Sequence, residues 1–324
     1  MESEFLGWLR TRLPASPWLR LGPGDDAAVL RLGEAGQTPA GIAPADVASA
    51  GIASADVIVT TDLLTDGVDF RVGSDDPRRI GRKALAVNLS DLAAMAAIPR
   101  AALFSVALPR EGALDLARAL YEGILPLAER FDVAIAGGDT NSWDGGLVIC
   151  VTAIGVPGPG GVLKRSGAKP GDDILVTGPL GGSILGHQFD FQPRVEEALH
   201  LMQRYELHAG LDCSDGLARD VARLCEASGC GAEIDMAQVP IADDAKKLSQ
   251  QQANGVTPLE HALHDGEDFE LILAVAPQVT ARILADRTHP TPLTRIGRFV
   301  PEQGLWQLDA SGQRKPLSPK GWEH

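Results

Sequence analysis

The chain has 324 residues, of which 44% are hydrophobic and 22% charged, a composition that excludes the disordered, fibrous and membrane-embedded classes. Its 43 acidic and 29 basic residues give a net charge of −14, which argues against nucleic acid as a partner, because such surfaces need clustered Lys and Arg. The acidic start and the lack of an apolar run of about 18 residues predict a cytoplasmic protein without a membrane partner.

The first half of the chain alternates short apolar strands with helical patterns. Strands are expected over 27–32, 57–64, 101–108, 133–136 and 147–156, with helices over 77–97 and 111–130. Pro126 is expected to kink or shorten the second helix. In the first helix Asn88 and Asp91 are three residues apart and therefore project together. A duplicated segment, GIAPADV at 41–47 and GIASADV at 51–57, is interpreted as an inserted loop that runs into a strand.

The Pro- and Gly-rich stretch Gly155–Gly161 predicts a boundary between a domain at 1–157 and a second domain at 158–324. In the second half, strands are expected over 174–177, 211–213, 232–235, 269–275, 294–300 and 305–308, and helices over 183–187, 193–207, 216–227 and 277–286. Because the alternation is uneven in both halves, we predict two α+β domains instead of a doubly wound sheet. The four cysteines form no metal-binding pattern, and we expect reduced, buried thiols.

Aspartates recur where a strand ends or a helix begins, at Gly24-Asp25-Asp26, Thr60-Thr61-Asp62, Asn88-Leu-Ser-Asp91, Gly137-Gly138-Asp139 and Asp212-Cys-Ser-Asp215. Scattered carboxylates on rigid element ends suit Mg²⁺, which prefers oxygen ligands in octahedral geometry. Each motif alone is equally explained as a turn or a helix cap. Asp91 is the exception, since it lies on the apolar-leaning face of a helix, where an unpaired carboxylate is costly. Its position favours a metal ligand.

Two glycine-rich turns are candidate phosphate sites. Gly22–Ala27 precedes a strand and carries two aspartates, so a dinucleotide-binding function is rejected. Gly178–Ser183 follows a strand and opens a helix, where its amides either bind a phosphate or cap the helix. Arg165 is placed to reach ATP phosphates, although such a residue alone is more often a solvated surface residue. The chain contains no P-loop.

Taken in order, seven segments resemble the thiamine-monophosphate kinase family of the aminoimidazole ribonucleotide synthetase-like superfamily: GDDAAVL at 24–30, TTDLLTDGVDF at 60–70, KALAVNLSDLAAMAA at 83–97, AGGDTN at 136–141, KRSGAKPGDDILVTG at 164–178, DCSDGL at 212–217 and DGEDFELIL at 265–273. The resemblance implies direct in-line transfer of phosphoryl from ATP to thiamine monophosphate, with several Mg²⁺ ions. It also implies a homodimer in which the mixed sheets of the N-terminal domains pair.

The resemblance assigns roles to individual residues. Those that match magnesium positions are Asp26, Thr60, Thr61, Asp62, Asp91, Asp139, Asp212 and Asp215. Those that match ATP positions are Gly138, Asp139, Arg165 and Ser214. Those that match thiamine phosphate positions are Asp69, Glu267 and Trp322. No covalent catalytic residue is expected, because metals and Arg165 would stabilise the charge.

Two residues depart from the family pattern. Asp69 stands where His is common, and Asp265 stands where Gly is usual, so both changes bear on substrate affinity. The alternatives are another ATP-using enzyme of the superfamily, a metal-dependent phosphatase and a non-catalytic nucleotide-binding module. A selenophosphate-forming enzyme would want a reactive cysteine near the N-terminus, whereas the first cysteine is Cys150.

Overall fold

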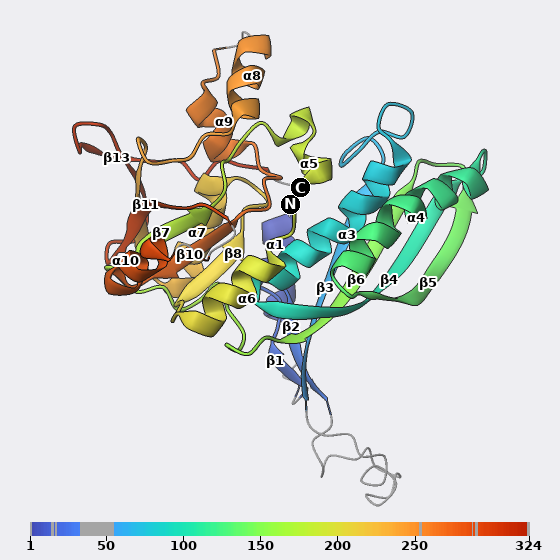
Figure 1. Cartoon of the computed structure of the whole chain (residues 1–324), viewed down its shortest axis with the longest axis horizontal. Coiled ribbons are helices and arrows are strands. Elements are labelled where there is room, and N and C mark those ends of the chain that lie inside the picture. The colour runs from blue at the N-terminus through green and yellow to red at the C-terminus, as the bar shows by residue number, and fades with distance from the viewer. Residues whose placement is uncertain are drawn as a thin grey trace, which may run out of the picture.

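The structure is a computed structural model that describes residues 2–13, 16, 18–32, 55–252, 255–286, 288 and 291–322. Two mixed sheets, one from each half of the chain, lie side by side with helices packed on them (Figure 1). The segment after Pro157, where the sequence predicts the domain boundary, connects the two sheets. Most of the duplicated segment at 41–57 lies outside the described residues, and its last residues form the start of a strand.

The sheet of the first half has six strands in the order β1-β2-β3-β6-β4-β5. Their bounds are β1 Leu19–Leu21, β2 Ala28–Leu32, β3 Ala55–Thr65, β4 Ala97–Pro109, β5 Ala134–Trp143 and β6 Val148–Pro157. The accompanying helices are α1 Glu2–Arg10, α3 Pro77–Ala94 and α4 Ala113–Arg130. All neighbouring strands are antiparallel except β4 and β5, which are parallel. Helices α3 and α4 pack against each other on one face of this sheet (Figure 1).

The sheet of the second half has seven strands in the order β13-β12-β9-β11-β7-β10-β8. Their bounds are β7 Asp173–Thr177, β8 Ala209–Asp212, β9 Gly231–Asp235, β10 Leu271–Val275, β11 Leu293–Val300, β12 Gly304–Leu308 and β13 Arg314–Pro316. The helices are η1 Ser183–Leu185, α5 His187–Asp190, α6 Val195–Arg204, α7 Leu217–Ser228, α8 Asp243–Gln252, α9 Pro258–His264 and α10 Pro277–Ala285. The two mixed sheets and their helices confirm the predicted α+β class.

Helix α3 is the central element between the two halves, in contact with α4, α6, β3, β6 and β8. Pro77 occupies its first turn, and the N-cap Asp76 accepts a 2.9 Å hydrogen bond from the amide of Arg78. From Lys83 to Ala94 every residue is buried except Asp91, which is half-buried. The predicted helix end at 97 is wrong, because Ala96 adopts a left-handed φ of 50° and Ala97 begins β4.

Strand β5 differs most from its prediction, since it runs through Gly137-Gly138-Asp139 where the sequence placed a strand end. All of its residues except Ile135 are exposed, so the strand carries no apolar alternation that would reveal it. A side chain at Gly138 would lie 1.8 Å from the carbonyl oxygen of Phe104 in β4, which explains the glycine. Helix α4 likewise continues through Pro126 to Arg130.

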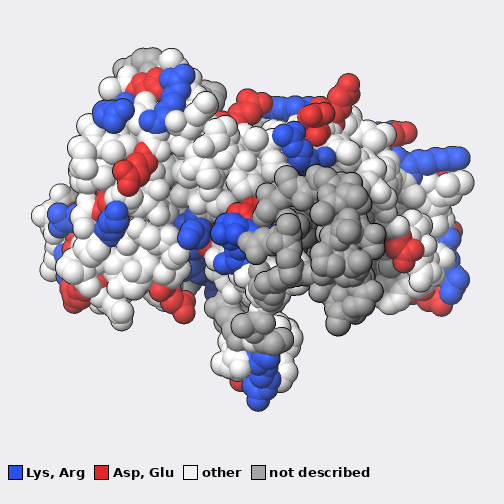
Figure 2. Space-filling view, turned by 90° about the horizontal axis from the view of Figure 1, so that it is seen from below, with Lys and Arg blue, Asp and Glu red and all other residues white. Residues whose placement is uncertain are grey.

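Charged side chains are interspersed over the face seen in Figure 2, with no broad field of one sign among its described residues. All four cysteines are free, and Cys213, Cys225 and Cys230 are buried. In the described part of the chain, no helix combines the length and the hydropathy needed to cross a membrane.

Candidate active site

Three carboxylates from both halves of the chain converge on one point. Oxygens of Asp26, Asp91 and Asp212 all lie within 4.8 Å of one another. Asp26 precedes β2, Asp91 comes from α3, and Asp212 is the last residue of β8 in the other sheet. The packing of α3 against β8 brings the two halves together at this place.

The cluster is poorly solvated and strongly self-repelling. Burial, followed by repulsion from Asp62 and Asp212, raises the pKa of Asp91 well above its ordinary value. Burial and the neighbouring Asp26 likewise raise the pKa of Asp212. The pKa of Asp62 is raised to about 6, mainly by burial and then by Asp69. The arrangement therefore calls for a compensating cation.

Hydroxyl groups hold two of the carboxylates in place. Thr60 donates through Oγ1 to Asp91 at 2.5 Å and contacts the carbonyl oxygen of Asp26 at 3.2 Å. Ser90 donates through Oγ to Asp212 at 2.5 Å. Ser90 is not among the residues predicted from the sequence, although it directly precedes Asp91. A serine within a helix gives no signal by itself, because its partner is brought near only by tertiary packing.

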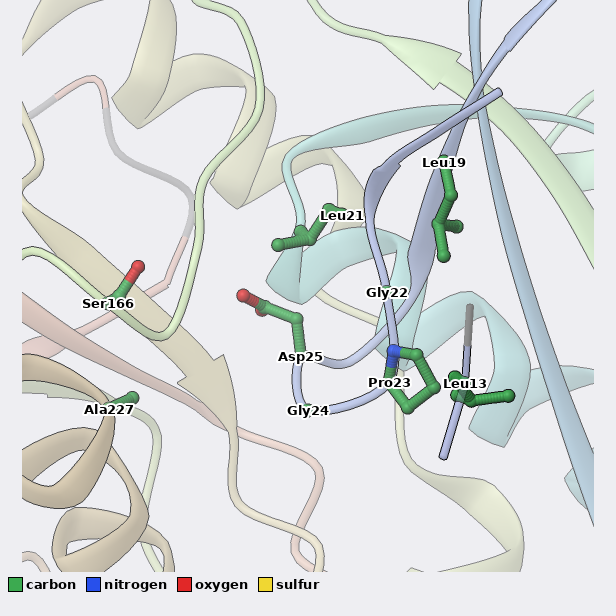
Figure 3. Close-up of a pocket in the computed structure, with 9 residues that line it drawn as sticks. All are labelled: Leu13, Leu19, Leu21, Gly22, Pro23, Gly24, Asp25, Ser166 and Ala227. Carbon is green, nitrogen blue, oxygen red and sulfur yellow. The ribbon is translucent and has the colours of Figure 1, made fainter. Parts of the chain in front are cut away.

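Arg165 pairs directly with one carboxylate of the cluster. Its Nη2 lies 2.5 Å from Oδ1 of Asp26, and its backbone amide donates to Asp25 at 3.1 Å. Arg165 is thus ion-paired, not the solvated surface residue that was its alternative explanation. Burial and repulsion from Asp26 raise the pKa of Asp25 to about 6. The turn that carries Asp25 also borders an open cavity of about 410 Å³, with Ser166 and Ala227 on its opposite side (Figure 3).

The donor set fits Mg²⁺. One oxygen each of Asp26 and Asp62 is buried without a hydrogen-bond partner, so these atoms are left for a ligand. Carboxylate and hydroxyl oxygens are the donors that this hard cation takes. Asp26, Asp62, Asp91 and Asp212, with Thr60 beside them, are the residues that would hold it.

Two predicted ligands lie elsewhere in this chain. The side chain of Thr61 points to the opposite face of β3 from Thr60 and Asp62, where it donates to the carbonyl oxygen of Val151 at 3.1 Å. Asp139 lies on β5, separated from β3 by β6 and β4, which is roughly 14 Å across the sheet. Its carboxylate accepts from the amide of Thr140. The metal and ATP roles of Thr61, Gly138 and Asp139 stay predictions.

The loop after β8 adjoins the cluster. Asp215 forms an ion pair of 2.5 Å with Arg223, and its carbonyl oxygen accepts from the amide of Trp322 at 3.0 Å. The C-terminal segment therefore returns to the loop after β8, and the role of Trp322 in binding thiamine phosphate stays a prediction. The carbonyl oxygen of Ser214 accepts from the amide of Glu267 at 2.7 Å.

A second polar centre joins two of the three residues predicted to contact thiamine phosphate, Asp69 and Glu267. The ammonium of Lys83 lies 2.5 Å from Oε1 of Glu267 and 2.9 Å from the carbonyl oxygen of Asp69. The Asp69 carboxylate accepts from the amide of Thr65 at 2.7 Å and closes its own turn. Glu267 and Phe269 both have left-handed φ values, 55° and 53°, and such backbone strain is concentrated at functional sites. No pattern in the sequence indicates the role of Lys83.

Two backbone amides of the Gly178–Ser183 turn donate hydrogen bonds to aspartate side chains and are therefore not free to bind a phosphate. The amide of Gly181 donates to Asp268 at 2.8 Å, and that of Gly182 donates to Asp265 at 3.0 Å. Asp265 also lies 2.9 Å from Nδ1 of His261. The phosphate interpretation of this turn is therefore not supported, and Asp265 acquires a structural role.

Comparison with known proteins agrees with this geometry. Residues 24–157 match the model of the AIR synthase related protein, N-terminal domain, and residues 148–305 match that of its C-terminal domain. A hydrogenase maturation protein, HypE of Escherichia coli, shares the fold with a TM-score of 0.69 at 20% identity over 99% of each chain. Fold and site thus define a two-domain protein of the AIR synthase-related class.

Relatives within that class are more specific. The chain is 42% identical to a thiamine-monophosphate kinase of Rhodopirellula baltica over 100% of this chain and 97% of that one. It is 36% identical to the Bacillus subtilis thiamine-monophosphate kinase, and the match covers 82% of this chain and 87% of that one. A solved structure of AaThiL complexed with AMPPCP and TMP has a TM-score of 0.77 and 25% identity, and the match covers 100% of this chain and 95% of that one. The chain belongs to the thiamine-monophosphate kinase family and is a phosphotransferase with a phosphate group as acceptor.

Proposed function

We propose that the chain transfers the γ-phosphoryl group of ATP directly to the phosphate of thiamine monophosphate, yielding thiamine diphosphate and ADP, with Mg²⁺ at the carboxylate cluster. The convergence of Asp26, Asp91 and Asp212 from both halves of the chain carries this proposal. The complex of AaThiL with an ATP analogue and TMP supports the choice of substrates.

The residues supply positioning and charge, because an ionised phosphate acceptor needs no strong base. Mg²⁺, when bound, would neutralise charge on the phosphates. Asp26, Asp62, Asp91 and Asp212 would hold it, with the hydroxyls of Thr60 and Ser90 orienting two of these carboxylates. Arg165, oriented by Asp26, would bind a phosphate oxygen, and the strained loop of Glu267 would bind the organic part of the acceptor.

Replacing Asp91 by Asn tests the metal assignment. The variant keeps the size of the side chain but removes one negative charge, so turnover should fall by about 100-fold or more. A coupled assay with Mg²⁺, ATP and thiamine monophosphate measures this loss. Asp144→Asn serves as the control, because the Asp144 side chain is 85% exposed and this substitution removes the same charge. Unchanged phosphoryl transfer in Asp91→Asn would show that the metal assignment is wrong.

Product analysis separates the kinase from the phosphatase alternative. The wild-type protein should form thiamine diphosphate and ADP in equal amounts. Release of inorganic phosphate from either substrate, without diphosphate formation, would instead support hydrolysis by the same aspartates. The first outcome would also exclude a non-catalytic nucleotide-binding module.

We also propose a homodimer in which the sheets of the first domains pair. The supporting observation is β5, an edge strand of ten residues that is exposed along almost its whole length. Light scattering should give about twice the mass of 34.1 kDa. A monomer at assay concentration would contradict this proposal while leaving the site of the single chain as described.

A further inference from the structure

Lys83 is among the most deeply buried charges in the described chain, with its side chain only 1% exposed. It lies on α3, two turns before Asp91, and its ammonium bonds to segments of both halves. A buried ammonium is strongly unfavourable unless every donor is paired and the charge is balanced. The partners of Lys83 therefore indicate what the residue does.

Three acceptors surround this ammonium, and each comes from a different segment. They are the carbonyl oxygen of Asp69 at 2.9 Å, Oε1 of Gln188 at 2.8 Å and Oε1 of Glu267 at 2.5 Å. An ammonium has three N–H donors, so all of them are engaged. Lys83 consequently has no donor left to bind a phosphate itself.

Two of those three segments carry predicted contacts to thiamine phosphate. The Asp69 turn follows β3 in the first half, whereas Glu267 lies in the strained loop before β10 in the second half. The left-handed φ of Glu267 is disfavoured for a residue with a side chain, and contacts around it must hold that conformation. The ion pair to Lys83 and the bond from its amide to Ser214 are two such contacts.

We propose that Lys83 is a positioning residue that fixes Glu267 relative to the Asp69 turn and so shapes the thiamine phosphate site across the two halves. This inference rests on the proposed function, because it takes Glu267 and Asp69 as contacts to that substrate. Lys83 acts through Glu267, and none of its three hydrogen-bond partners is a residue that would hold Mg²⁺.

The variant Lys83→Met tests the role, since Met has a similar length without charge or donors. Calorimetric titration with thiamine monophosphate should show a Kd raised by about 10-fold or more, because Glu267 loses its counter-charge. The Kd for a non-hydrolysable ATP analogue with Mg²⁺ should change by less than about 2-fold. A merely structural role would weaken both ligands alike.

Arg82 offers a matched control on the same helix. Its guanidinium donates to the carbonyl oxygens of Phe189 at 2.7 Å and Phe191 at 2.5 Å, so it also links the halves without touching Glu267. Arg82→Met should leave the Kd for thiamine monophosphate within about 2-fold of wild type. An equal loss of affinity in both variants would overturn the proposal. Breaking any link between the halves would then weaken thiamine monophosphate binding, with no special role for Lys83.

A double-mutant comparison tests the route through Glu267. If Lys83 acts through that carboxylate, Lys83→Met combined with Glu267→Gln should bind thiamine monophosphate no more weakly than Glu267→Gln alone. Fully additive losses would overturn the proposal. If Lys83→Met fails to fold, Gln188→Ala decides the question, with an expected loss of about 3-fold and an unchanged Kd as the contrary result.

Binding is measured separately from turnover so that the two proposals fail differently. Wild-type protein that binds thiamine monophosphate but forms no diphosphate would contradict the proposed reaction and leave the positioning role testable. Intact turnover with no selective effect of Lys83→Met would contradict the positioning role alone. Wild-type protein that binds no thiamine monophosphate would overturn both.

Discussion

At the scale of single residues, the carboxylates of Asp91 and Asp212 are each held by a hydroxyl group from another element, Thr60 of β3 and Ser90 of α3. The sequence reveals these two kinds of residue to different degrees. Asp91 was recognisable because a carboxylate on an apolar helix face needs an explanation. Lys83, Ser90 and Gln188 gave no such signal, since their side-chain partners are 105 to 184 positions away in the chain. Only the packing of the two halves reveals what these polar groups contact.

Asp265 illustrates how a departure from a family pattern acquires meaning from its contacts. Its carboxylate accepts from the amide of Gly182 and pairs with His261, so Asp265→Gly should lower the free energy of unfolding by about 1–2 kcal/mol. Urea unfolding measures the change, with Asp265→Asn as the milder control. The Kd for thiamine monophosphate should stay the same. Full stability in Asp265→Gly would show that these contacts contribute nothing.

At the scale of elements, helices and strands with an apolar pattern were predictable, including α4 and α10 with their few buried residues, whereas polar or very short strands were not. Helix α3 and strand β3 follow apolar patterns of the expected period, and their predicted bounds differ by a few residues. Strand β5 is polar and exposed, and its length is set by its pairing with β4. Its amino-acid composition therefore gives no indication of where the strand ends. Short edge strands such as β1 and β13 were missed for the same reason.

The crossing of α3 and α4 depends on two glycines. A side chain at Gly123 would lie 1.7 Å from the carbonyl oxygen of Arg78, and one at Gly81 would lie 2.1 Å from that of Leu120. Gly123→Ala should therefore push the helices apart and lower stability by about 2–3 kcal/mol. Thermal unfolding measures this loss.

Gly7 provides the control for that substitution, because it is also in a helix but has open space around it. Gly7→Ala should raise stability slightly, by about 0.5–1 kcal/mol, as expected for alanine in a helix interior. Similar effects of the two substitutions would mean that α3 and α4 do not approach as closely as described.

At the scale of the whole molecule, the carboxylates that join the two halves make stability depend on pH. The pKa of Asp62 is about 6, and the pKa values of Asp91 and Asp212 are also raised above those of an unfolded chain. The folded state then holds more protons than the unfolded state, so stability falls as pH rises from about 4 through the folded pKa values.

Thermal unfolding of the metal-free protein should consequently give a lower Tm at pH 8 than at pH 5. Mg²⁺ should raise the Tm more at pH 8, where the carboxylates are ionised, than at pH 5. Asp91→Asn should reduce both the pH dependence and the response to Mg²⁺. A Tm that rises between pH 5 and pH 8 without metal would contradict the charge assignment of the cluster.

The pairing of β3 on both sides has a consequence for how this protein tolerates length variation. Thr60 and Asp62 face the site because β3 is in register with β6 from Ile58 to Thr65 and with β2 from Ala55 to Val59. A slip by one residue would turn Thr61 towards the site and remove Thr60 and Asp62 from it. Since β6 alone fixes eight positions of this register, residues can be inserted or deleted between β2 and β3 without moving the ligands.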